Sequence, residues 1–145
     1  MIKISVIVIL LAGFVAIGCS SGNNNDNGGF VFGKGKYKFK MSDSSGTEYL
    51  NGILNVKNYE NGVISGTYEF KKISNDKFDG FSSMSGEFEG NVNLKEKVVF
   101  INTNPKIADS NVFWNMKIGN KSLYGSWQYS VFRGKTSGGK VKVYN

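Results

Sequence analysis

Alternation of apolar and polar residues runs through most of the chain and constrains the fold more than any other feature. Its period of two is that of a β-strand, whose successive side chains point to opposite faces of a sheet. In residues 31–41, Tyr37, Phe39 and Met41 alternate with lysines. Similar stretches begin near residues 50, 64, 84, 112, 123 and 141, and residues 97–103 form a further strand whose inward face the pattern leaves open. The pattern predicts an all-β protein with one face of each strand buried.

Two short loops predict how neighbouring strands pair. A three-residue loop at 60–62, with Gly62 in the left-handed region, would keep Val56 and Gly66 on the same face. A two-residue loop at 119–120 would set two pairs of inward residues opposite each other, namely Trp114 with Gly125 and Met116 with Leu123.

Eight such strands joined by short turns predict an antiparallel up-and-down β-barrel. Glycines recur on the predicted inward faces, where a missing side chain lets a sheet bend sharply and leaves room for a large residue opposite. A two-sheet β-sandwich would also explain the alternation and remains the alternative.

Two fragments resemble known barrels. Ile64-Ser65-Gly66-Thr67-Tyr68 is similar to the Gly-Thr-Tyr strand of avidins, and Gly125-Ser126-Trp127 is similar to a late strand of that family that carries a tryptophan. The resemblance implies a barrel of the lipocalin and avidin-like type and covers architecture only, because the polar residues that contact biotin in avidins are not recognisable here.

The N-terminus has the three parts of an export signal. Lys3 is followed by the apolar stretch 4–17 and by the small residue Gly18, directly before Cys19. The apolar stretch is shorter than the roughly 20 residues that a transmembrane helix needs. Two alternatives stay open, a transmembrane anchor and an ordinary secretory signal, although the second would leave one reactive thiol on an exported protein.

Residues 16–19 resemble the lipobox of bacterial lipoproteins, with Ala16 where lipoboxes usually carry leucine. The resemblance implies cleavage between Gly18 and Cys19 and attachment of lipid to Cys19. It also implies a cell-envelope location, with Ser20 favouring the outer membrane over the outer leaflet of the cytoplasmic membrane. We therefore expect a helical signal peptide at 1–18, a lipidated flexible tether at 19–29 and a β-barrel domain at 30–145.

The residue content excludes the common catalytic centres. The chain has no histidine and one cysteine, so it lacks the residues for Ser-His, Cys-His or His-ligated metal chemistry. Glu87 and Glu89 share the predicted solvent face of one strand, which gives neither the cleft nor the raised pKa that a glycosidase needs. We expect a protein that is not an enzyme and uses no cofactor or metal.

The chain is basic, with a formal net charge of +7. If the first and last strands pair, a basic surface forms from Lys34, Lys36, Lys38, Lys40, Lys140 and Lys142. Export argues against nucleic acid, so an anionic envelope component is the expected polyanion. Outward Phe113, Tyr124 and Phe132 indicate a smaller contact patch.

Two functions fit this architecture. The first is a lipocalin-like carrier that holds a small apolar ligand in a lumen lined by aromatic residues, namely Tyr37, Phe39, Tyr68, Phe88, Trp114, Trp127 and Tyr129. The second is an interaction module whose basic outer face binds an envelope protein, a host protein or an anionic polymer. An open lumen would favour the carrier, and a filled lumen would favour the interaction module.

Overall fold

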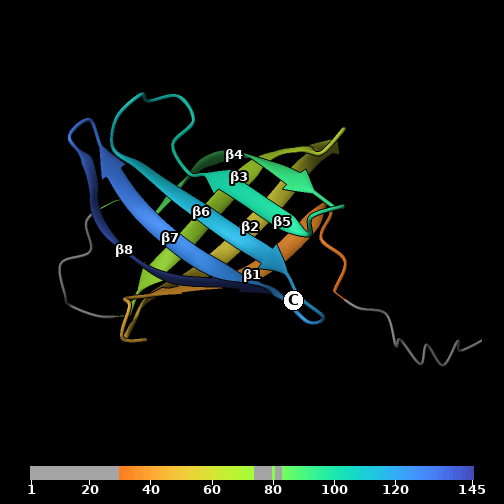
Figure 1. Ribbon diagram of the computed structural model, residues 1–145, viewed down its shortest axis with the longest axis horizontal. Helices are drawn as coiled ribbons and strands as arrows, with labels where there is room; N and C mark the ends of the chain where they lie inside the picture. Colours follow the sequence, from red (N-terminus) through yellow and green to blue (C-terminus); the bar gives the residue numbers. More distant parts are fainter. Residues whose placement is uncertain (1–29, 74–79, 81–82) are drawn as a thin grey trace, which may run out of the picture.

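The protein forms a closed barrel of eight strands in a computed structural model that describes residues 30–73, 80 and 83–145 (Figure 1). The predicted signal peptide, Gly18, Cys19 and the tether lie outside the described residues. The strands are β1 (Gly35–Ser42), β2 (Glu48–Glu60), β3 (Val63–Lys72), β4 (Ser85–Asn93), β5 (Val98–Asn102), β6 (Asn111–Ile118), β7 (Leu123–Val131) and β8 (Gly134–Tyr144).

Each strand pairs antiparallel with its neighbours in the sequence, and β1 closes the barrel by pairing with β8. Phe39 faces Val143 across this seam, and Met41 faces Val141. The up-and-down barrel is therefore confirmed. Closure removes the sandwich alternative, because a sandwich would leave β1 and β8 on separate sheet edges.

Alternate residues of every strand point into one apolar core. Phe39, Leu54, Phe88 and Trp114 are fully buried there, and the lysines between the inward residues of β1 are exposed. In β5, whose parity the sequence left open, Val99 and Ile101 point inward and Phe100 points outward.

Inward glycines lie opposite large side chains, as predicted. Gly66 pairs with Phe88, Gly86 with Tyr68, and Gly139 with Trp127. A Cβ on Gly66 would collide with the carbonyl oxygen of Asn55 on the neighbouring strand. The strands therefore approach one another more closely at these points than any residue with a side chain would allow.

The β2–β3 hairpin reaches the predicted pairing by a different route. Glu60 pairs with Val63, so the loop contains only Asn61 and Gly62, with φ angles of 50° and 81°. The predicted loop length was wrong. An irregularity between Val56 and Asn58 adds the extra residue instead, and Val56 still pairs with Gly66.

The predicted β6–β7 turn was also wrong. Its loop has four residues, 119–122, and is closed by a hydrogen bond from the Gly119 N–H to the Ser122 carbonyl. Ile118 pairs with Leu123, so each β6 residue pairs with a β7 residue two positions later than predicted. Trp114 therefore faces Trp127 and not Gly125. The longer loop also frees the Asn120 carbonyl to accept a 2.6 Å hydrogen bond from Phe30 N–H. A shift of two residues keeps every side chain on its predicted face.

The first strand begins later than predicted because the chain before it crosses the end of the barrel. Phe32 is only 3% exposed, although strict alternation would place it on the outer face with the lysines that follow it. Its ring packs 5.0 Å from that of Tyr37, and Phe30 packs on both. These three rings close one end of the barrel.

Candidate functional site

The predicted lumen residues form a packed core. Six of the seven are buried, namely Tyr37, Phe39, Tyr68, Phe88, Trp114 and Trp127, and Tyr129 is half-buried against them. The rings of Phe39 and Trp114 are 4.9 Å apart near the barrel centre. The most pronounced hollows of the described residues all open to solvent. An eight-stranded barrel can be filled by its own side chains. In the described part of this barrel, the inward side chains fill the interior.

A small hollow of about 160 Å³ lies at the end of the barrel opposite Phe30. Tyr68, Gly86, Thr103 and Asn104 contribute to its wall. Burial raises the pKa of the Tyr68 phenol, because its charged form would lose hydration. The hollow is smaller than the roughly 300 Å³ at which pockets for drug-sized ligands begin.

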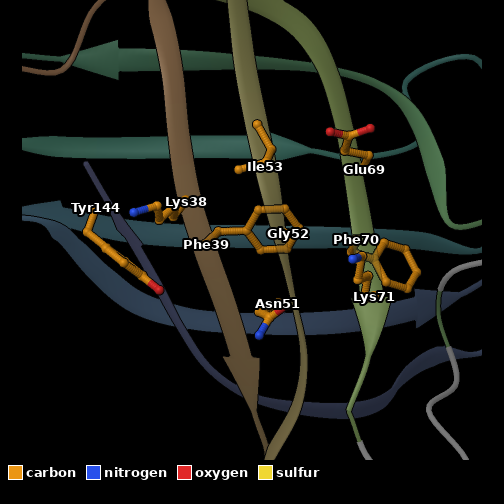
Figure 2. A pocket seen from close by; sticks show the side chains of 9 residues that line it. All are labelled: Lys38, Phe39, Asn51, Gly52, Ile53, Glu69, Phe70, Lys71 and Tyr144. Carbon is orange, nitrogen blue, oxygen red and sulfur yellow. The ribbon is translucent and has the colours of Figure 1, made fainter.

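A larger groove, of about 450 Å³, crosses the outer wall over β1, β2 and β3. Gly52 is at its centre, between Phe39 and Phe70 in register, and these two residues form the floor. Figure 2 shows Lys38 and Tyr144 on one side of Gly52, and Glu69 and Lys71 on the other. The groove therefore presents two cations, one carboxylate and a phenol around an apolar floor.

The predicted basic surface divides into two parts. We call Lys38, Lys40, Lys140 and Lys142 the wall lysines, because they point outward from the paired region of β1 and β8. Lys40 lies directly opposite Lys142, and Lys38 lies opposite Tyr144, which ends β8. The sequence predicted that Lys34 and Lys36 would lie beside Lys140 and Lys142. This prediction was wrong, because Lys34 and Lys36 lie beyond the paired region.

Acidic residues compensate little of this charge. Lys40 forms a 3.2 Å ion pair with Glu48. Within the described residues, the only other ion pair joins Lys106 to Glu87 on a different face of the barrel. The outward acids of the wall gather on β3 and β4, at Glu69, Glu87 and Glu89. The wall is therefore basic along the β1–β8 seam, whereas β3 and β4 carry acids and lysines together.

The outward aromatic residues are only partly a contact patch. Phe113 is half-buried because its ring stacks on Phe100, with 5.7 Å between the centroids. Tyr124 is exposed between Lys117 and Lys142 in register, and it lines a shallow hollow with Phe100. Phe132 is 96% exposed at the β7–β8 turn. The sequence analysis did not include Phe100 among the outward aromatic residues, because alternation did not show which face of β5 is buried.

The two carboxylates singled out in the sequence lie on the outer face of β4, as predicted. Glu87 and Glu89 are exposed on β4. The hydrogen bond and positive charge of Lys106 lower the pKa of Glu87. Among the described residues no group of three or more His, Cys, Asp or Glu side chains is placed to hold a metal ion.

Comparison with known proteins supplies no relative. No protein-family model, characterised protein or solved structure matches the chain. In the part of the chain that the structure describes, no helix is long and apolar enough to span a membrane.

Proposed function

We propose that the protein is a lipid-anchored module of the bacterial cell envelope that binds an anionic polymer through the wall lysines and does not catalyse a reaction. The packed interior carries this proposal. Because the described side chains fill the barrel, the surface with the greatest capacity for recognition is the outer wall. A carrier of a small apolar ligand would need internal volume that the described residues do not leave.

The charge pattern of the wall supports an anionic partner. Lys40 and Lys142 lie directly opposite each other on paired strands, where like charges lower stability, and only Lys40 has an acidic partner, Glu48. Lys38 adds a third cation and also lines the groove over Gly52. A polymer with carboxylates along its length would neutralise the wall lysines, and its sugar rings could pack on Tyr144.

The anchor is supported by the sequence alone, through the apolar leader and the resemblance of residues 16–19 to a lipobox. Labelled palmitate is expected to enter the protein in cells and to be lost in Cys19→Ser. Persistent labelling of Cys19→Ser would overturn the assignment of the lipid to this residue.

Binding is tested separately, with polygalacturonate as the anionic probe and dextran as its neutral control. We expect the protein to bind polygalacturonate in a salt-sensitive way and not to bind dextran. Reversing Lys38 and Lys142 to Glu should weaken it roughly tenfold or more, since each exposed ion pair contributes about 0.2–1 kcal/mol and reversal adds repulsion.

The matched control reverses Lys72 and Lys135, which lie outside the paired region of β1 and β8 and change the net charge equally. Equal loss in both double variants would mean that net charge alone drives binding. Unchanged binding after reversal of Lys38 and Lys142 would remove the wall lysines from the function.

A further inference from the structure

One end of the barrel differs from the other in charge. We call it the proximal end, because the described chain enters there at Phe30. The antiparallel order also places the turns β2–β3, β4–β5 and β6–β7 at this end, together with the last residue of β8. Figure 1 shows these turns on the right-hand side of the barrel, with the β6–β7 turn next to the label for the C-terminus. The other end is the distal end.

The proximal end carries six exposed lysines and two exposed acids in and beside its turns. The lysines are Lys34, Lys36, Lys95, Lys97, Lys117 and Lys121, and the acids are Glu60 and Glu96. None of the eight forms an ion pair within the described residues. The described part of the distal end is closer to balance, with Lys71, Lys72, Lys106, Arg133 and Lys135 against Asp43, Glu48, Glu87 and Asp109.

Apolar side chains project among the proximal lysines. Val31 is 83% exposed, Val63 is 54% exposed and Leu94 is 62% exposed. Val63 and Leu94 lie at or beside turns, and Val31 lies in the segment that precedes β1. The distal end also exposes apolar side chains, among them Phe132, so the excess of lysines is what distinguishes the proximal end. Apolar tips surrounded by lysines are typical of surfaces that lie in the interfacial region of a membrane, where lysines reach the phosphates and apolar groups enter the acyl boundary.

The path of the chain connects this end to the proposed anchor. Phe30 donates its N–H to the Asn120 carbonyl, and Phe30 and Phe32 pack on Tyr37, so the chain leaves the barrel at the proximal end. Only residues 19–29 separate Phe30 from Cys19. Even fully extended they reach about 36 Å. An acylated Cys19 would therefore hold the proximal end within reach of the bilayer.

We propose that the proximal end is a docking surface for an anionic phospholipid bilayer. The identity of the leaflet rests on the proposed lipid anchor, but the contact itself needs no acyl chain. Docking would orient the barrel with its axis roughly perpendicular to the membrane surface, the proximal lysines on the lipid phosphates and the distal end facing away. The wall lysines would then stand beside the bilayer, open to a polymer.

The test uses the chain from residue 19 with Cys19→Ser, which retains every described residue and so the complete barrel. We expect it to sediment with vesicles of phosphatidylglycerol and phosphatidylcholine at low salt, and not with phosphatidylcholine alone. Reversing Lys34, Lys97 and Lys121 to Glu should lower the partition coefficient by at least about 100-fold, since each lysine near an anionic membrane contributes about fivefold.

The matched control reverses Lys72, Arg133 and Lys135 at the distal end, with the same change in net charge, and should keep most of the binding. Equal loss in both triple variants, or no binding to anionic vesicles, would overturn the docking surface. Reduced polygalacturonate binding with unchanged vesicle binding in the proximal triple would instead assign this end to the polymer. Because the test omits the acyl chain, its failure is distinct from a failure of palmitate labelling.

Discussion

At the scale of single residues, the two tryptophans have matching positions and different hydrogen bonding. They face each other across β6 and β7, and both are buried. Trp127 donates from Nε1 to the Ser42 carbonyl at 2.7 Å, which ties β7 to the end of β1. The Nε1 of Trp114 is buried and has no hydrogen-bond partner among the described residues. One indole N–H therefore stabilises the barrel, and the other carries the cost of lost hydration.

Replacing each tryptophan with phenylalanine separates these effects, because both changes remove the same volume. Trp127→Phe also loses a hydrogen bond, whereas Trp114→Phe removes an unsatisfied donor. We expect Trp127→Phe to be the less stable variant by about 1–3 kcal/mol, measured as the free energy of unfolding in urea. Equal losses would show that the bond to Ser42 contributes nothing.

At the scale of strands, the inward glycines determine how closely neighbouring strands approach. Gly66→Ala would place a Cβ against the Asn55 carbonyl oxygen and the Phe88 ring, and the carbonyl cannot move without shifting its strand. We expect a loss of at least about 2 kcal/mol in unfolding free energy. Gly33→Ala is the control, because a Cβ at Gly33 meets nothing within 4 Å, and it should change stability by less than about 0.5 kcal/mol. Similar losses in both variants would contradict a role for close approach.

The strands also show how far sequence alone can predict this fold. Alternation identified the inward residues because burying one face of a sheet leaves a single acceptable parity. It could not determine loop length, since the two-residue β2–β3 turn with its irregularity and a three-residue loop give the same pairing of Val56 with Gly66. The burial of Phe32 was missed because it depends on a crossing of the barrel end and not on strand parity.

The candidate surfaces were predictable to different degrees. Parity alone placed the wall lysines outside, and closure between the first and last strands brought Lys40 opposite Lys142. The proximal cluster needed the three-dimensional path, because Lys34, Lys97 and Lys121 come from distant parts of the sequence. They gather only when the turns and the chain entering at Phe30 share one end.

At the scale of the whole molecule, closure of the barrel carries an electrostatic cost at its seam. Lys40 and Lys142 point outward from directly paired positions of β1 and β8. Lys142→Glu would replace this repulsion with attraction, and we expect unfolding free energy to rise by about 0.5 kcal/mol at low salt, a gain that should shrink as salt screens the charges. Lys135→Glu is the control, since it changes the net charge equally and lies at the β7–β8 turn.

The same Lys142→Glu variant should bind polygalacturonate more weakly than the unaltered protein, so that stability and binding change in opposite directions. Paired urea titrations and binding isotherms on one preparation measure both quantities. A variant that is more stable and binds equally well would show that the lysine pair merely protects the seam. A variant that is no more stable than Lys135→Glu would show that the repulsion is negligible. A gain in unfolding free energy together with weaker polygalacturonate binding would mean that Lys142 lowers the stability of the seam and contributes to binding.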